Sequence, residues 1–252
     1  MTIPSLDAVL PLVRADRAAG LLPAWGWSTA VDENVGSAVV DRDVFDALHE
    51  AAGIDASFPV GHAGLVHVYG YLFSAVETPY GLKSDRWNDG VLARLLGLAP
   101  SWFRLGDSPD ETPLARVTAA ALPLLLDPPA GATAVIDQVI DHARVPAGSS
   151  DGPDGLRGSD AADQPPRHAR TPADNTRGSA ETTAAPTAPA RTRAVVTAAT
   201  PDGSAALVSG VDAGPGLQLI TVFPVADGRA FAAGVREGDP RLRWNAQLPP
   251  TA

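Results

Sequence analysis

Apolar residues recur at helical spacing mainly in the first half of the chain. Residues 41–52 show the pattern most clearly, because apolar side chains fall on one face, acidic residues occupy the first turn and a glycine follows as a stop. Thr112 and Pro113 predict a second helix, with a capping hydroxyl followed by a proline at the first helical position. Weaker patterns predict an N-terminal helix interrupted by Pro11 and a short helix ending at Gly97.

The residues after 193 instead alternate short apolar runs with turn sequences, which predicts an antiparallel meander. Pro224 is expected to end the third strand, Asp227 to cap a short turn, and Arg241–Asn245 to form a last strand. Early helices followed by a late antiparallel sheet predict the α+β class. The three expected strands of the meander are 194–199, 205–211 and 217–222.

Two segments have apolar positions that fit both the helical and the strand period. Residues 132–145 have apolar positions that suit a helix and a buried strand equally well, and both stay open. For residues 61–74 a helix would place Gly70 in mid-span at a cost of about 1 kcal/mol, which favours a strand. The aromatic face of that strand would consist of His67, Tyr69, Tyr71 and Phe73.

A segment poor in large apolar side chains separates the two halves. From about residue 147 to about residue 192 the only such side chain is Leu156, amid Gly, Ser, Asp, Ala, Pro and Thr. Because so little surface can be buried, we expect a disordered and expendable insert at 147–192. The flanking residues 1–146 and 193–252 are expected to form one interrupted domain, since the second piece is too short for an efficient core of its own.

Charge and cysteine content narrow the function classes. A formal net charge of −10 opposes binding to phosphate backbones and anionic lipids, and the absence of cysteine excludes disulfides and thiolate chemistry. The first residues lack the basic start and apolar core of a secretory signal, and the uncharged apolar runs are too short to span a bilayer. We therefore expect a soluble cytoplasmic protein without nucleic-acid or membrane partners.

Common catalytic and cofactor motifs are missing from the sequence. It contains no G-x-x-x-x-G-K-[ST], no G-x-G-x-x-G opening a helix and no G-x-S-x-G. His62 and His67 lie five residues apart, a spacing that suits neither one helical face nor one strand face. No metal site is expected, and the cofactor is left unknown.

Residue types able to perform chemistry concentrate between His67 and Trp87, a stretch that contains all three tyrosines and Lys83, the only lysine of the chain. Residues 78–81, Thr-Pro-Tyr-Gly, predict a turn. An aromatic face leading into this turn could line a pocket for a small-molecule substrate, with a general base and a cation for a substrate carboxylate. The alternative is an aromatic core face beside a surface turn. The candidate catalytic residues are Lys83, His67, Tyr69 and Glu77, and the candidate substrate-binding residues are Tyr71, Tyr80, Arg86 and Arg243.

The pocket hypothesis makes a geometric demand. It requires Tyr69, Tyr71, Lys83 and Arg243 to converge on one cavity, although they are distant in the sequence. For Arg243 to reach the others, the predicted strand Arg241–Asn245 would have to lie across the sheet from the 67–87 region.

Three segments resemble those of a family of uncharacterised actinobacterial proteins, some of which carry the label amino acid deaminase. They are HVYGYLFSAVETPYGLKSDRW (67–87), ETPLARVTAAALPLLLDPP (111–129) and RLRWNA (241–246). A deaminase would need an imine-forming lysine with its cofactor, a flavin site or a metal-activated water. The chain offers Lys83 for the first of these, without a phosphate cup for pyridoxal phosphate.

Three function classes follow. The first is a small-molecule enzyme of amino-acid metabolism, deaminase-like, that uses the 67–87 region. The second is a non-catalytic module in which the same aromatic face binds a metabolite or a protein. The third is a small nuclease-like fold, suggested by helices followed by a meander, against which the acidic charge argues.

Overall fold

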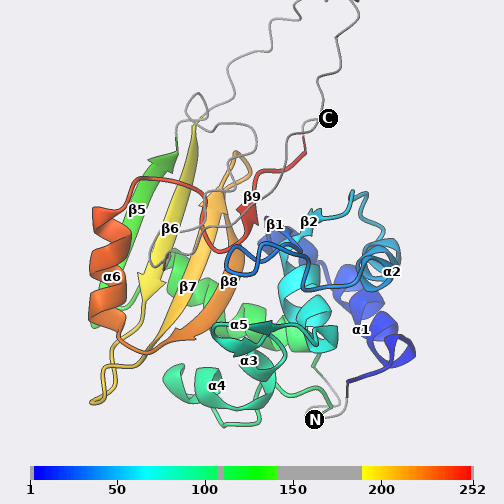
Figure 1. Cartoon of the computed structure of the whole chain (residues 1–252), viewed down its shortest axis with the longest axis horizontal. Coiled ribbons are helices and arrows are strands. Elements are labelled where there is room, and N and C mark those ends of the chain that lie inside the picture. Colours follow the sequence, from blue (N-terminus) through cyan, green and yellow to red (C-terminus); the bar gives the residue numbers. More distant parts are fainter. Residues whose placement is uncertain (1–2, 107–110, 141–188, 251–252) are drawn as a thin grey trace, which may run out of the picture. The chain divides into compact units, whose positions relative to one another are not determined.

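The alternating pattern of the C-terminal part folds as an antiparallel sheet of order β5-β6-β7-β8 (Figure 1). The computed structural model describes residues 3–106, 111–140 and 189–250. The predicted α+β class and the late meander are confirmed, and the open segment 132–145 contributes a strand. The four strands are β5 (Ala134–Ile140), β6 (Ala190–Val196), β7 (Ala205–Asp212) and β8 (Leu217–Val225).

The two faces of this sheet are both apolar and are covered by different helices. Ala194 and Val196 pack toward α6 (Gly228–Glu237), whereas Val195 between them joins the main core. Helix α5 (Pro113–Leu126) contacts β6, β7 and β8 on that second face. Burial on both faces explains why β7 is apolar along nearly its whole length and does not simply alternate.

The helices of the first half form where the apolar spacing predicts them. Thr112 caps α5, because its hydroxyl accepts a hydrogen bond from the Ala115 amide at 3.1 Å. Pro11 was expected to interrupt the N-terminal helix, yet α1 continues through it, and α5 likewise continues through Pro123. The remaining elements are α1 (Leu6–Ala18), a 3₁₀ turn (Leu22–Ala24), α2 (Arg42–Ala52), α3 (Asp85–Asn88) and α4 (Val91–Leu95).

Residues 63–73 are helical, so the strand predicted over 61–74 is wrong. Only β2 (Val60–His62) is extended, and a π-helical turn (Leu65–Tyr69) and a 3₁₀ turn (Gly70–Phe73) follow it. Gly70 leaves room for the side chain of Val40, because a Cβ at this position would lie 3.0 Å from a methyl group of Val40. This close packing offsets the low helix propensity of glycine. At helical spacing, residues two apart no longer share a face, whereas residues four apart do.

A second, smaller sheet joins the two ends of the chain. Its order is β2-β1-β9, with β1 (Trp27–Thr29) between β2 and β9 (Ala246–Gln247). The strand expected at Arg241–Asn245 is wrong: Trp244 and Asn245 have φ values of 57° and 65°, in the left-handed region. A two-residue hairpin, β3 (Glu77–Thr78) and β4 (Gly81–Leu82), confirms the predicted turn between them.

Three further expectations concern the C-terminal part. Strand β8 continues through Pro224, and Asp227 caps the ten-residue helix α6, longer than the short turn expected. Most of the predicted insert lies outside the described residues, and β6 begins at Ala190, close to the expected end of the insert at about residue 192. The described residues on both sides of it belong to one compact unit. Within the described ranges, no helix combines the length and apolar character needed to cross a membrane.

Candidate functional site

A cavity of about 720 Å³ lies within this unit, and a small-molecule site is typically of that size. Its walls come from the loop after β1, the π-helical turn, the β3–β4 hairpin, α3, β8 and the segment before β9. Charged and polar lining residues are Asp32, Glu33, Asn34, His67, Tyr71, Thr78, Tyr80, Lys83, Asp85, Arg86, Asp89, Ser204, Thr221, Asp227 and Asn245. Apolar lining residues include Leu82, Val91, Leu95, Phe223, Phe231 and Trp244.

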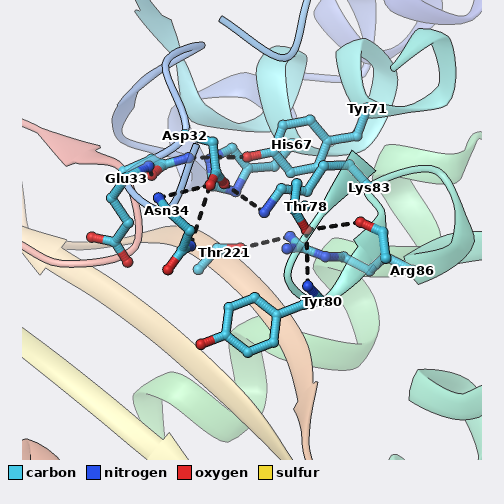
Figure 2. Close-up of polar contacts among 12 residues, drawn as sticks. Asp32, Glu33, Asn34, His67, Tyr71, Thr78, Tyr80, Lys83, Arg86 and Thr221 are labelled. Atoms are coloured by element: carbon cyan, nitrogen blue, oxygen red, sulfur yellow. Dashed lines mark hydrogen bonds and ion pairs between the residues drawn. The ribbon is translucent and has the colours of Figure 1, made fainter. Parts of the chain in front are cut away.

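A buried ion pair forms one end of the polar wall. Lys83 Nζ lies 2.6 Å from Asp32 Oδ2, and their side chains are 10% and 2% exposed. Asp32 Oδ1 also accepts a hydrogen bond from the Asn34 amide at 2.9 Å, which fixes the turn after β1. Figure 2 shows the Lys83 and Asp32 side chains pointing toward each other, while the Glu33 carboxylate points away from them.

The two charges of this pair influence each other's proton affinity. Burial raises the pKa of Asp32, but hydrogen bonding and attraction to Lys83 outweigh it, and the pKa lies below the ordinary value of 3.8. Burial lowers the pKa of Lys83 from its ordinary 10.5, although Asp32 opposes that effect, and the nearby Arg86 lowers it further. The lysine is therefore easier to deprotonate than a surface lysine.

Arg86 lies beside the ion pair and is surrounded by aromatic rings. Its guanidinium carbon is 5.1 Å from the ring centre of Tyr71, 5.9 Å from that of Trp87 and 5.5 Å from that of Phe223. Nη1 donates a hydrogen bond to Thr221 Oγ1 at 3.0 Å (Figure 2). Among the described residues no carboxylate pairs with it, although burial lowers its pKa and so penalises its charge. A guanidinium has five N–H donors, so Arg86 keeps donors for a ligand.

His67 and Tyr71 stack on one face of the helical segment, as their spacing of four residues requires. Their ring centres are 4.9 Å apart, with planes inclined by 19°. Asn245 Nδ2 donates to the Tyr71 hydroxyl at 3.2 Å, and Ser28 Oγ lies 2.6 Å from His67 Nε2. Burial, and then repulsion from Arg86 and Lys83, holds the pKa of His67 well below 6.5, so the ring is neutral at pH 7.

The β3–β4 hairpin forms the mouth of the cavity. Thr78 Oγ1 donates to the Gly81 carbonyl at 2.8 Å and accepts from the Tyr80 amide at 3.2 Å, which holds the turn. The Tyr80 side chain is 81% exposed, and its ring extends away from the polar cluster in Figure 2. An exposed aromatic ring at a cavity mouth is available to contact a ligand.

Five of the eight predicted site residues line this cavity: His67, Tyr71, Tyr80, Lys83 and Arg86. The other three lie elsewhere. Tyr69 bonds to Asp16 in the core, Glu77 is exposed on β3, and Arg243 donates to the Asp239 carbonyl. The demand that Tyr69, Tyr71, Lys83 and Arg243 converge is therefore not met, because the helical segment separates the two tyrosines and residues 241–245 form no strand.

Sequence reasoning missed the partners from other parts of the chain. Asp32 stands in a polar turn after β1, and its turn-forming Asp-Glu-Asn sequence was an available sign of that structure. Thr221 comes from β8, and nothing in a meander strand marks one threonine as the neighbour of an arginine 135 residues away. Asn245 is positioned by the left-handed backbone of residues 244 and 245, a conformation that the local sequence did not predict.

Five carboxylates and two cations line the cavity, so its charge is acidic overall. Among the described residues, no group of three or more potential metal ligands forms. Comparison with protein-family models, curated proteins and solved structures gives no match, so the chemistry of the site rests on its own residues.

Proposed function

We propose that the protein binds a small zwitterionic metabolite in this cavity, an amino acid with an apolar side chain. Arg86 is the observation on which the proposal depends. A half-buried guanidinium that lacks a carboxylate partner among the described residues and lines a cavity is suited to the planar, bidentate geometry of a ligand carboxylate.

The remaining lining explains why the ligand should carry a positive charge as well. Glu33, Asp85, Asp89 and Asp227 add negative charge to the wall, and Asp32 neutralises Lys83. This surplus repels polyphosphates and favours a ligand with an ammonium group. It also means that no observation favours the nuclease-like alternative.

An apolar wall completes the match to an amino-acid side chain. Val91 and Leu95 from α4 face the cavity together with Phe223, Phe231 and Trp244. The last three rings contact one another, with centres 6.0 to 6.2 Å apart. Such a surface would hold an aliphatic or aromatic side chain by burial of apolar area.

Isothermal titration of the purified chain with a panel of L-amino acids tests this proposal. Arg86→Met keeps the stem among the aromatic rings and removes the charge, and we expect it to weaken binding about 10- to 100-fold, since hydrogen bonds to charged groups are lost. Arg243→Met, outside the cavity, is the matched control and should bind as the parent does. If no amino acid binds, or if Arg86→Met binds unchanged, the proposal fails.

Deamination of the bound amino acid is the second candidate function. Its support is the buried Lys83, whose lowered pKa brings the amine closer to the neutral form that imine formation requires. Ammonia release from the same amino-acid panel, lost in Lys83→Ala, would support an enzyme. Binding without ammonia release would leave the metabolite-binding module.

A further inference from the structure

Three aromatic side chains that line the cavity are only partly buried: Phe223 from β8, Phe231 from α6 and Trp244 from the segment before β9. All three pack against the apolar cluster between the sheet and α6. Because these rings also line the cavity, the surface that remains exposed on them is available to a ligand there. This ring cluster (Phe223, Phe231 and Trp244) would be stabilised by burial against an apolar group of the ligand.

The rings of the cluster already adopt the geometries that aromatic pairs prefer. Phe231 and Trp244 stack with their planes inclined by 24°, and Phe223 approaches each of them edge-on, at 82° and 64°. Ring pairs of these kinds are more favourable than burial of their area alone would make them. A ligand ring placed against the cluster gains the same contribution, whereas an aliphatic side chain gains only burial.

The backbone beside the ring cluster is held in an unfavourable conformation. Trp244 and Asn245 are adjacent and have φ values of 57° and 65°, which residues other than glycine rarely adopt. The Asn245 carbonyl accepts hydrogen bonds from the Ser28 hydroxyl and the Thr29 amide, both at 2.9 Å, and these bonds maintain the conformation. Backbone strain of this kind clusters at functional sites, so its occurrence at the cavity wall supports a role for Trp244 in ligand binding.

Phe223 connects the ring cluster to Arg86. The guanidinium carbon of Arg86 lies 5.5 Å from the centre of the Phe223 ring, and the centres of Phe231 and Trp244 lie 6.1 Å and 6.2 Å from the same ring. A carboxylate bound by Arg86 would therefore bring the side chain of an amino acid beside the cluster. We infer that the cavity takes an aromatic amino acid, with its carboxylate on Arg86 and its ring against the ring cluster, an inference that rests on the proposed function and narrows it from apolar to aromatic side chains.

Isothermal titration with four L-amino acids tests the selection of the side chain. Phenylalanine, tryptophan and leucine are compared with cyclohexylalanine, which has nearly the size of phenylalanine but no aromatic ring. The parent protein should bind phenylalanine or tryptophan at least about tenfold more tightly than leucine and about 3- to 10-fold more tightly than cyclohexylalanine. If leucine or cyclohexylalanine binds as tightly as the aromatic amino acids, the inference fails while amino-acid binding by Arg86 stands. If none of the four binds, the proposed function fails as well.

Replacement of one ring shows whether the ring cluster causes the preference. Phe231→Leu removes a ring and keeps an apolar side chain against the core. We expect the preference for phenylalanine over leucine to fall at least about threefold, while leucine binds within about twofold of its affinity for the parent. The matched control is Phe58→Leu, which removes a partly buried ring that contacts Phe45 outside the cavity and should keep the full preference. An unchanged preference in Phe231→Leu would refute the inference.

Nuclear Overhauser effects in the parent protein provide a readout that needs no substitution. At saturating L-phenylalanine, the ring protons of the ligand should show intermolecular effects to the Trp244 indole and to the Phe231 ring. Effects confined to other residues, such as Tyr80 and Leu82 at the cavity mouth, would overturn the inference even if Phe231→Leu failed to fold.

Discussion

Tyr69 and Tyr71 are two residues apart in one helical segment, yet they belong to two polar clusters of opposite character. The Tyr69 hydroxyl donates to Asp16 at 2.5 Å, and Thr112 donates to the other oxygen of the same carboxylate. This closed cluster (Asp16, Tyr69 and Thr112) lies in the core between α1 and the start of α5. Tyr71 belongs to the cavity cluster, where it contacts His67, Lys83, Arg86 and Asn245.

The difference between the clusters lies in what their polar groups still lack. In the closed cluster, both oxygens of Asp16 have a protein donor, and its side chain is fully buried. In the cavity cluster, Arg86 keeps hydrogen-bonding capacity among the described residues. Burial alone therefore does not mark a binding site; unsatisfied capacity beside a cavity does.

Replacement of the aspartate in each cluster should give the largest difference in stability between the two clusters. Asp16→Ala leaves the buried hydroxyl of Tyr69 without its partner, and we expect the free energy of unfolding to fall by about 2–4 kcal/mol. Asp32→Ala should cost about 1–2 kcal/mol, because cavity water can solvate the freed Lys83. Urea denaturation of both variants measures the difference. Equal losses would contradict the distinction between a closed and a cavity cluster.

The two tyrosines provide a matched pair with a smaller effect. Tyr69→Phe removes a hydrogen bond to a buried carboxylate and should cost about 1.5–3 kcal/mol of unfolding free energy. Tyr71→Phe removes a hydrogen bond between neutral groups, at 3.2 Å from Asn245, and should cost about 0.5–1 kcal/mol. Thermal and urea unfolding of the two variants give the comparison. A larger loss for Tyr71→Phe would mean that the cavity cluster holds the fold together.

The smallest expected effect is on the pH dependence of the free energy of unfolding. As the pH falls, the contribution of Asp16 should raise this free energy and that of Asp32 should lower it. Burial raises the pKa of Asp16 above 3.8, despite hydrogen bonds from Thr112 and Tyr69, so its unfavourable contribution disappears as the pH falls through that raised pKa. The pKa of Asp32 lies below 3.8, so its favourable contribution is lost as the pH falls below 3.8.

Unfolding free energies measured across this pH range in two variants test the signs. Asp16→Asn should lose the gain that acidification brings above 3.8, and Asp32→Asn should lose the decline below it. Changes of the same sign in the pH dependence of both variants would contradict the opposite effects of the two carboxylates on stability.

Most elements of the fold could be predicted from local sequence. Thr112 and Pro113 start α5 as their chemistry requires, and the meander follows its apolar runs and turns. The 61–74 segment could not be predicted, because its aromatic and β-branched residues suit a strand while its packing against Val40 and the core selects a helix. Tertiary contacts outweigh local preferences of this size.

The sequence by itself determined that reactive side chains gather between His67 and Trp87, because their presence and order are written in the chain. Tertiary structure alone decided which of them act together. It turned Tyr69 toward Asp16, placed Tyr71 with Lys83 and Arg86, and supplied Asp32, Thr221 and Asn245 from distant segments. The reason is that a residue's partners depend on the period of its own segment and on contacts across the core, neither of which local spacing specifies.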